Sequence, residues 1–524
     1  MTKVVIDPLT RIEGHLRITC EVADGKVVDA WNTCTLFRGF EIFMENIKPK
    51  DTWQFAQRIC GVCPTPHAIN SATAAERAMG LEKVVDNARL VRNMLDAAQV
   101  SYDSILWFYV LNAFDYVNVP DAALAKTSDP QLEAVRSQVA ALIASGQTGP
   151  FSNMYWDNPG YVLSPLENLT LVAHYIQSLD AQQAANRAAA ILGGKFPMIM
   201  NMAAGGITQL PSLEEVIYYK DQMRIAQEFT ENVMWPDLLA VAGAYSVLAN
   251  YGQGVGNYLT WGVFDEKSQN PYDRVFPRGG VFKGQLDVHK VDPMEARIYT
   301  KYSYYDDSVG GGKRPLEAGQ SPVQFTGWPP LDGPEFPTGK YDWTRAARYP
   351  NPAGVDVPME VGPLAEVLVA YLDRRPEVVV YVDEVLAALG ATGKPQVLMS
   401  SLGRIAARVI KARVNADRAL QWADSLLANV KAGDNEIYTE PPNVEGSGEG
   451  VSGFDAPRGA LSHYCRTTNG IVTKYATVPA SNWNFAPRDD KGVRGPVEEA
   501  LIGTPVGNPD QPLEILRTVH TFDP

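Results

Sequence analysis

The feature that most constrains the fold of this chain is a series of long helical patterns. Residues 166–192 form the clearest one, and Gly193-Gly194 directly after it is a strong stop signal for a helix. Residues 69–117 also have a helical pattern, with a break near Gly80. Further helices are predicted at 131–145, 212–251, 364–372, 381–390 and 398–432. We therefore expect a central bundle of long helices.

The first residues of the chain predict antiparallel strands instead. Polar and apolar side chains alternate on both sides of Asp24-Gly25, a dipeptide that is typical of a two-residue hairpin turn. That turn places Cys20 opposite Asp29. It places Cys34 opposite His15, so the two thiols are not cross-strand neighbours. Five cysteines in 524 residues also exclude a scaffold built on disulfides.

Together these patterns predict an α+β fold that is predominantly helical. We expect one large domain of several layers over residues 1–524, with an N-terminal β-hairpin sheet beside the central bundle and irregular, strand-rich segments. In the last predicted helix, the basic side chains are expected to form a solvated face (Arg404, Arg408, Lys411 and Arg413). The expected subregions are an N-terminal sheet (1–57), a helical core (58–251), an irregular wrap (252–358), further helices (359–432) and a strand-rich segment (433–524).

The chain is acidic, with 46 Lys and Arg against 60 Asp and Glu and a net charge of −14. An acidic surface argues against nucleic acids and anionic membranes as partners. Residues 1–6 show no basic segment followed by a long apolar run, and no run of about 18 apolar residues occurs elsewhere. We therefore expect no signal peptide and no membrane span in this chain, which is soluble or reaches another compartment with the help of a partner.

The strongest chemical motif is residues 58–67, Arg-Ile-Cys-Gly-Val-Cys-Pro-Thr-Pro-His. Cys60 and Cys63 are close enough in sequence to bind one metal or one pair of metals. Arg58 favours the thiolate form that binds metals, and His67 lies within reach of the same site. By itself the motif also fits a thiol–disulfide redox pair or two packed core residues. The other cysteines are isolated (Cys20, Cys34 and Cys465).

Three carboxylates are candidates for a role beside this motif. Glu13 lies in a loop dense in charge, where a carboxylate is most often solvated; its functional alternative is a buried proton carrier. Glu41 is either a surface carboxylate or an oxygen ligand for a hard cation. Asp115 follows an apolar run, so we expect it to be buried and to need a partner.

Several short motifs occur in order along nearly the whole chain. They are residues 7–15 (Asp-Pro-Leu-Thr-Arg-Ile-Glu-Gly-His), 38–41 (Arg-Gly-Phe-Glu), 58–63, 192–195 (Leu-Gly-Gly-Lys), 456–460 (Ala-Pro-Arg-Gly-Ala) and 517–524 (Arg-Thr-Val-His-Thr-Phe-Asp-Pro). In this order they resemble the large subunit of nickel-iron hydrogenases, and most of all its uptake-type, dimeric, respiratory branch. The resemblance implies an enzyme that oxidises H2 to protons and electrons in a reversible reaction.

The resemblance also implies ligands for a nickel-iron centre. Cys60 is implied as a terminal nickel ligand and Cys63 as a bridge between nickel and iron, with carbon monoxide and cyanide on the iron. Soft thiolates suit nickel in a redox site. Heterolytic cleavage of H2 then needs a base, which is either a cysteine thiolate or Arg458. Glu13 is implied to carry protons from the site toward the exit path.

Further roles implied by the resemblance lie around this centre. Arg458, which follows Pro457, is implied to contact a cyanide and to form a charged canopy with Asp115 and Asp523. Either Ala480 or Ser481 is implied as a second neighbour of cyanide. A magnesium ion is implied nearby, bound by two groups of this chain (Glu41 and the backbone carbonyl of Ala476).

The resemblance further implies a partner and a location. The chain lacks the cysteines for an iron-sulfur cluster, so electrons are expected to leave through an iron-sulfur small subunit, in a heterodimer or a dimer of heterodimers. Contact with a membrane is expected only through partner subunits. The expected location is the periplasm or the membrane surface, reached through the small subunit, and the alternative is the cytoplasm.

One departure from the family concerns the end of the sequence. The family continues after its Asp-Pro with Cys-x-x-Cys-x-x-His, whereas this sequence stops at Pro524. Because the preceding residues match closely, we expect the segment to be absent from the sequence rather than from the protein. The alternatives are a truncated, inactive form and a metal-free, hydrogenase-like scaffold. A thiol-redox protein based on Cys60 and Cys63 alone leaves Arg458 and Glu41 unexplained.

Overall fold

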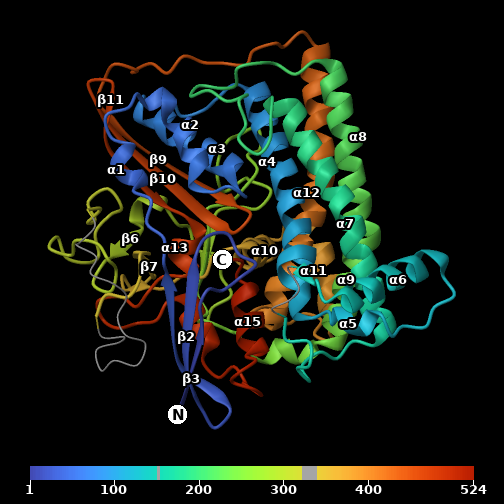
Figure 1. Cartoon of the computed structure of the whole chain (residues 1–524). Coiled ribbons are helices and arrows are strands. Elements are labelled where there is room, and N and C mark those ends of the chain that lie inside the picture. The colour runs from blue at the N-terminus through green and yellow to red at the C-terminus, as the bar shows by residue number, and fades with distance from the viewer. Residues whose placement is uncertain (150–153, 322–338) are drawn as a thin grey trace.

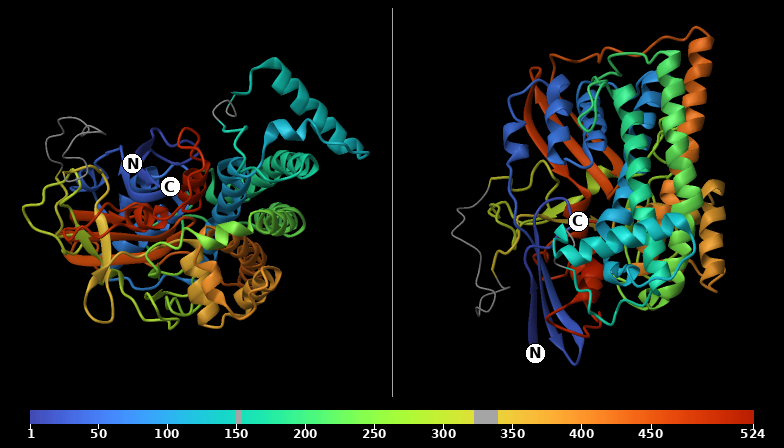
Figure 2. Two further views of the ribbon diagram at one scale, coloured as in Figure 1. Left: turned by 90° about the horizontal axis from the view of Figure 1, so that it is seen from below. Right: turned by 45° about the vertical axis from the view of Figure 1, so that its right-hand side comes forward.

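Four long helices form one layer of the molecule in the computed structural model, which describes residues 1–149, 154–321 and 339–524. They are α4 (Asp86–Leu106), α7 (Pro165–Gly193), α8 (Leu213–Phe229) and α12 (Ser401–Lys431), which pack side by side (Figures 1 and 2). Ser164 caps α7 by accepting a hydrogen bond from the backbone N–H of Glu167, and Ser212 caps α8 in the same way. The predicted bundle is therefore confirmed.

Shorter helices surround this layer. They are α1 (Phe40–Phe43), α2 (Thr52–Ala56), α3 (Pro64–Ala78), α5 (Val119–Ala122), α6 (Pro130–Ser145), α9 (Trp235–Ala244), α10 (Pro363–Leu372), α11 (Pro376–Ala388), α13 (Ala480–Asn484), α14 (Pro496–Leu501) and α15 (Leu513–His520). The break predicted near Gly80 separates α3 from α4, and α11 begins five residues before its predicted start because Pro376 opens it.

The N-terminal sheet is a three-stranded antiparallel sheet of β1 (Thr2–Ile6), β2 (Leu16–Ala23) and β3 (Lys26–Cys34). The predicted hairpin turn is present, but a bulge between Glu21 and Val22 shifts the pairing beyond it by one residue. Cys20 therefore lies opposite Ala30, and Cys34 lies opposite Leu16. The predicted pairs were wrong by one position, and the two thiols are still not cross-strand neighbours.

A second antiparallel sheet, in the order β11-β10-β9, packs against α3 (Figure 1). Its strands are β9 (Gly448–Ala456), β10 (Gly459–Thr468) and β11 (Ile471–Val478). Gly450 lets α3 approach closely, because a Cβ at this position would lie 2.1 Å from the carbonyl oxygen of Ala74. This contact holds the sheet against the helix that follows Cys63.

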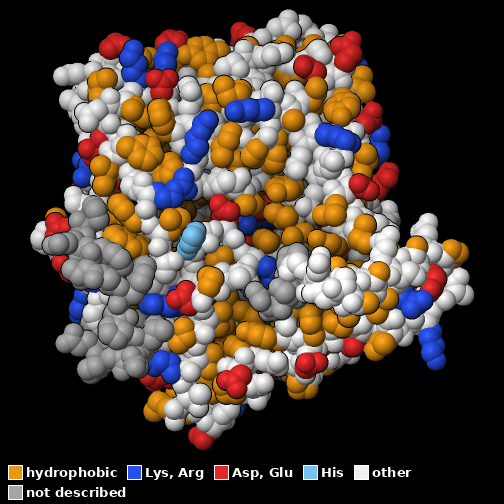
Figure 3. Space-filling model, in the orientation of Figure 1, with side chains coloured by type: hydrophobic (Ala, Val, Ile, Leu, Met, Phe, Trp, Pro, Cys, Tyr) orange, Lys and Arg blue, Asp and Glu red, His pale blue; other side chains and the backbone are white. Residues whose placement is uncertain are grey.

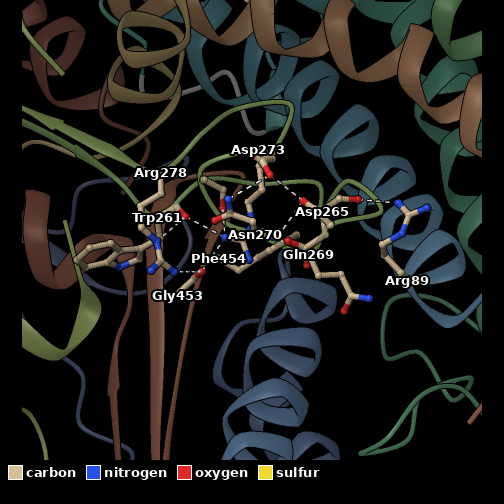
Figure 4. Close-up of polar contacts among 12 residues, drawn as sticks. Arg89, Trp261, Asp265, Gln269, Asn270, Asp273, Arg278, Gly453 and Phe454 are labelled. Atoms are coloured by element: carbon tan, nitrogen blue, oxygen red, sulfur yellow. Dashed lines mark hydrogen bonds and ion pairs between the residues drawn. The ribbon is translucent and has the colours of Figure 1, made fainter. Parts of the chain in front are cut away.

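The segment expected to be an irregular wrap has short strands: β4 (Tyr258–Thr260), β5 (Gly279–Val281), β6 (Arg297–Tyr299), β7 (Ala346–Pro350) and β8 (Asp356–Val357). Aromatic and arginine side chains anchor its described part to the second sheet. The guanidinium of Arg278 lies 6.0 Å from the Trp261 ring and donates weakly to the backbone carbonyls of Trp261 and Gly453 (Figure 4). Nearby, Arg89 donates to the carbonyl of Asp265 and thereby ties the wrap to α4 (Figure 4).

The basic side chains of α12 contradict the expectation of a solvated face. Arg404, Arg408 and Lys411 are buried, each within reach of a buried carboxylate. Their partners are Glu360 at 2.7 Å, Asp523 at 3.4 Å and Glu366 at 2.8 Å, respectively. Arg413, by contrast, is half-buried beside the exposed Glu231. A basic stripe at helical spacing fits both a solvated face and a buried set of ion pairs, and only the carboxylates that come from elsewhere in the chain decide between them.

Candidate active site

The motif with two cysteines lies between a short 3₁₀ turn and the start of α3. Cys60 and Cys63 are both buried, their Cα atoms are 5.4 Å apart, and their sulfur atoms lie against each other in the geometry of a disulfide. The backbone N–H of Cys63 donates to the sulfur of Cys60 at 3.0 Å. Pro64 at the first position of α3 fixes the direction in which the chain leaves the motif. Local sequence therefore brings both sulfur atoms to one point.

A cavity of about 140 Å³ opens beside the two sulfur atoms. Its wall is assembled from distant parts of the chain, since Arg458 and Pro524 line it together with Cys60 and Cys63. Pro524 lies at the middle of the molecule, as the C label in Figure 1 shows. The other lining residues are Glu13, Ile59, His67, Ala456, Leu461, Pro479, Ala480 and Ser481. Pro457 is buried and is not among them.

Arg458, in the turn between β9 and β10, is held by two buried aspartates. Its Nη1 lies 3.1 Å from Asp103, and its Nη2 lies 3.0 Å from Asp523. Asp523 also reaches Arg408 on α12. Burial raises the pKa of Asp103 to about 6, although Arg458 counteracts this effect. The three side chains form a compact charged canopy over the cavity.

Asp115 does not belong to this canopy, so the expected placement of its side chain was wrong. Its carboxylate binds Arg11 at 2.5 Å and His520 at 2.6 Å, and its backbone carbonyl accepts from Arg517. Burial alone would raise the pKa of Asp115, but Arg11 and His520 lower it to about 2. The expectation that Asp115 is buried with a partner is confirmed.

Asp103 is the residue that sequence reasoning missed. It lies in the last turn of α4, seven residues after Asp96, and both carboxylates are buried on the same face of the helix. Two carboxylates at this spacing on the apolar face of a helix are a signal of buried charge that needs a partner. The apolar run that made Asp115 a candidate instead, residues 107–111, lies beyond the end of α4.

His67 lies behind the cysteines in a chain of buried polar groups. Its Nδ1 is 3.0 Å from Nε2 of His463, whose Nδ1 is 2.7 Å from the hydroxyl of Tyr475. The Tyr475 hydroxyl in turn donates to Ser71 at 2.8 Å. Burial lowers the pKa of His67 to about 3, which keeps the ring neutral. A neutral His67 orients the site without adding charge to it.

Glu13 reaches the cavity and is exposed, as expected for a solvated loop carboxylate, whereas its functional alternative required a buried one. One carboxylate oxygen accepts from the backbone N–H of Gly61 at 3.3 Å, and the backbone N–H of Glu13 donates to Pro524 at 3.1 Å. The Asp7–His15 loop thus places an ionisable group between the cysteines and the surface, because Glu13 contacts the motif through its carboxylate and Pro524 through its backbone N–H.

Glu41 and Ala476, the residues predicted for magnesium, are brought together. Glu41 accepts from the backbone N–H of Thr477 at 2.8 Å and from Arg345 at 2.5 Å, and Thr477 directly follows Ala476. The carboxylate lines an open hollow of about 210 Å³ beside the cavity. In this arrangement Arg345 supplies the positive charge next to Glu41, and the magnesium site stays a prediction.

The groups at the cavity fit a thiolate-bound metal in part. Two sulfur atoms face it, and Nε of Arg458 is buried without a hydrogen-bond partner among the described residues. A small ligand that accepts a hydrogen bond would satisfy this donor. Among residues 1–149, 154–321 and 339–524, no three His, Cys, Asp or Glu side chains gather closely enough to hold a metal by themselves. The described part of the chain therefore supplies two soft ligands and one donor.

Known proteins resemble this chain over its whole length. A family model described as "Nickel-dependent hydrogenase" matches residues 38–524, and a model described as "HoxL-like" matches residues 3–32. The Hydrogenase-2 large chain of Escherichia coli (strain K12) is 36% identical, with 100% of this chain and 96% of that protein covered. The uptake hydrogenase large subunit of Rhizobium leguminosarum bv. viciae is 34% identical, with 100% and 94% covered.

Solved structures agree with this match. The H2-activated [NiFeSe]-hydrogenase of Dm. baculatum has a TM-score of 0.82 at 30% identity, with 100% of this chain and 98% of that chain covered. The Ni-Fe-Se hydrogenase of D. vulgaris Hildenborough in its reduced state has a TM-score of 0.81, also at 30% identity and the same coverage. The predicted fold class is confirmed, and the chain belongs to the nickel-dependent hydrogenase family.

Proposed function

We propose that this chain is the catalytic large subunit of a nickel-iron hydrogenase that oxidises H2 and passes electrons to an iron-sulfur small subunit. The observation that carries the proposal is the convergence of Cys60, Cys63 and Arg458 on one cavity, although Arg458 is distant from the cysteines in sequence. Sulfur ligands suit redox chemistry at a soft metal, and charged side chains in fixed positions stabilise the charges that separate beside it. The cavity has the sulfur atoms of Cys60 and Cys63 and the fixed charge of Arg458.

Cys60 and Cys63 would hold a nickel-iron centre, which when bound supplies the heterolytic cleavage of H2. Arg458 would donate from its unpartnered Nε to a small ligand at this position, in keeping with the cyanide contact implied by the resemblance. Ala480 and Ser481 line the same wall, so the chain leaves both as neighbours of such a ligand. Asp103 and Asp523 keep the guanidinium charged and fixed in orientation.

Glu13 moves the proton. Its carboxylate lies at the backbone of Gly61, between the cysteines, and it is exposed, so it can take a proton from a thiol and release it outward. Glu41 and the carbonyl of Ala476 are proposed to bind Mg²⁺ near this path. The contact between Glu41 and Thr477, which directly follows Ala476, supports that pairing.

The partner is proposed to be an iron-sulfur small subunit, possessing the cluster ligands that five cysteines here do not provide. Exposed apolar side chains around α1 and α2 support a protein partner on that side: Leu36, Ile42, Phe43 and Phe55. In the described part of the chain, no helix is long and apolar enough to cross a membrane. We propose a periplasmic or membrane-associated enzyme that is located through its small subunit and assembled as a heterodimer or a dimer of heterodimers. Fractionation of cells from the native host tests this location.

Metal analysis of the complex purified from its native host tests the proposed function. We expect about one nickel per large chain, and one iron in addition to the cluster irons. The variant Cys63→Ser should lose the nickel and the H2-oxidising activity. Cys465→Ser is the matched control, because Cys465 is a buried thiol on β10 outside the cavity, and it should keep both. A wild-type complex without nickel would contradict the proposal and leave an inactive apo form or a metal-free scaffold.

A further inference from the structure

A second buried cluster of charged side chains lies directly behind the turn that carries Arg458. It consists of Asp96 on α4, Glu366 on α10, Lys411 on α12 and Asp455 at the end of β9, and none of the four is more than 1% exposed. The active site described above uses none of them. Charged groups that are removed from water are stable only when they have partners of opposite charge or hydrogen bonds. The hydrogen bonds of the four side chains therefore show which of them can stay ionised.

The cluster is joined to the active-site turn through the backbone. Nζ of Lys411 lies 2.9 and 2.8 Å from the two oxygens of Glu366 and 3.4 Å from the carbonyl of Ala456, which lines the cavity. Asp455, the preceding residue, accepts from the hydroxyl of Thr260 and from the backbone N–H of Trp261. A change of charge in the cluster therefore acts close to Arg458.

Asp96 is the unusual member of the cluster. Both of its carboxylate oxygens are buried and have no hydrogen-bond partner among the described residues. The charged and titratable groups that face it are Lys411, Asp455 and, from α8, Tyr219, whose hydroxyl donates to the carbonyl of Met94 instead. An ionised carboxylate without a donor is very unfavourable in a protein interior. Asp96 is therefore a site that takes up a proton.

The charges of the whole buried region lead to the same result. Among the described residues, the cluster and the canopy contain five carboxylates (Asp96, Asp103, Glu366, Asp455 and Asp523), and they face four buried cations (Arg274, Arg408, Lys411 and Arg458). Full ionisation therefore leaves an excess of negative charge, which is unfavourable in an interior from which water is excluded, and the binding of protons relieves it. Asp96 and Glu366 are the carboxylates of this region outside the canopy whose pKa values are raised into the working range of an enzyme.

We propose that Asp96 and Glu366 act as a proton-holding pair behind the active site, and that their protonation sets the electrostatic potential at Arg458 while H2 is oxidised. They are positioning residues, since they act on the site through Lys411, Asp455 and the Arg458 turn. The effect on Arg458 during H2 oxidation rests on the proposed hydrogenase function, whereas the binding of protons by the pair does not.

The sign of the effect follows from the environment of the two groups. Burial raises the pKa of Asp96 to about 7 and that of Glu366 to about 8, and Lys411 partly counteracts both shifts. Asp455 adds to the shift of both groups, and Arg408 opposes that of Glu366. Both carboxyls are therefore neutral below these values, and the potential at Arg458 becomes more negative as the pH rises through them.

Infrared difference spectra of the purified complex, recorded between about pH 6 and about pH 9, test the proposal. Wild type should lose protonated-carboxyl C=O bands over this range, and Asp96→Asn and Glu366→Gln should each remove one of them. The same variants should move the pH profile of H2 oxidation by on the order of half a pH unit, because a charge near Arg458 no longer appears.

Glu498→Gln is the matched control. Glu498 on α14 is fully buried, burial raises its pKa to about 7, and its partners Tyr341 and Asn32 lie outside the canopy. This variant should remove a different infrared band and leave the pH profile in place. Asp96→Asn spectra and profiles equal to wild type would overturn the proposal, as would the same profile shift in Glu498→Gln. If Asp96→Asn does not fold, Glu366→Gln carries the same test. The infrared bands appear with or without nickel, so a failure of the proposed function would be seen separately.

Discussion

At the scale of the residue, the charged canopy depends on the shape of one side chain. Arg458 contacts Asp103 with one terminal nitrogen and Asp523 with the other, and the two carboxylates come from α4 and from the segment after α15. A planar guanidinium can bridge two carboxylates, whereas an ammonium is a single point charge. The site therefore requires the planar shape of an arginine side chain and not only its positive charge.

The variant Arg458→Lys keeps the charge and loses the bridge. We expect H2 oxidation, measured with an artificial electron acceptor, to fall by about 100-fold, because the fixed donors at the cavity are lost. Arg348→Lys is the matched control: Arg348 is fully buried and paired with Asp489 at 3.1 Å, away from the cavity. It should lower the melting temperature and keep the activity per folded molecule. Equal activity of Arg458→Lys and wild type would contradict the role given to Arg458.

We expect Asp115 to contribute to the stability of the folded protein and to its dependence on pH in acid, and not to catalysis. Its pKa is lowered to about 2 from the ordinary value of 3.8, since Arg11 and His520 outweigh burial. A carboxyl with a lowered pKa stabilises the folded protein at pH values above its ordinary pKa of 3.8. This stabilisation is lost as the pH falls toward about 2. Asp115→Asn should therefore cost about 2 kcal/mol at neutral pH, with a smaller difference from wild type in acid.

Thermal unfolding at a series of pH values between about 7 and 3 checks this prediction. Asp103→Asn provides the comparison, because burial raises rather than lowers the pKa of Asp103. The variant Asp103→Asn should lose activity, and its stability should fall in acid as much as that of wild type does. The assignment of the two aspartates would be wrong if Asp115→Asn reduced the activity more than Asp103→Asn did.

At the scale of the element, the turn between β9 and β10 has no room for a side chain next to Arg458. Gly459 has φ +118°, and a Cβ there would lie 2.2 Å from the backbone nitrogen of Gly362 before α10. Both features require glycine, because the conformation is strained for other residues and the clash is with the backbone. Packing of α10 against this turn thus fixes where Arg458 points.

Gly459→Ala should displace the turn and reduce H2 oxidation by about tenfold or more, together with the nickel content. Gly390→Ala is the matched control, since Gly390 also has a positive φ (+63°) but has no atom within 4 Å of the added Cβ. It should cost about 1 kcal/mol of stability and no activity. Similar losses of activity in both variants would show that conformational strain, rather than the contact with Gly362, matters.

At the scale of the whole molecule, the exposed apolar side chains predict how the chain associates. Figure 3 shows hydrophobic side chains spread over one face, and α1 has no buried residue at all. Phe43 on α1 is 45% exposed, whereas its neighbour Phe40 packs against it at 4.7 Å between ring centroids. An aromatic pair of this kind is typical of the centre of a protein interface.

Phe43→Glu should weaken the association with the small subunit by about tenfold or more, measured as the dissociation constant of the purified subunits. Ile217→Glu on α8 is the control, because Ile217 is 53% exposed and lies in the layer of long helices, away from α1. Its affinity should stay unchanged, and both variants should keep the melting temperature of the wild-type chain. Unchanged affinity in Phe43→Glu would place the partner elsewhere.

Much of the fold could be predicted because its signals are local. The pattern and the stop signal of residues 166–192 give α7 within one residue at each end, and the Asp24-Gly25 turn gives the hairpin of β2 and β3. The register failed beyond the bulge at Glu21, since a bulge is decided by packing on both faces of a sheet.

The sequence by itself determined the two cysteines, because three residues of chain and a following helix bring them together whatever the rest of the molecule does. Only the tertiary structure decided which aspartate meets Arg458. Asp103 and Asp115 lie on the same stretch of chain and are both buried, and the path of residues 456–459 and 520–524 past α4 selects Asp103. The same is true of Lys411, whose charge is buried because Glu366 arrives from α10. Local spacing fixes what neighbours in sequence can do, whereas the pairing of buried charges is fixed by packing between distant segments.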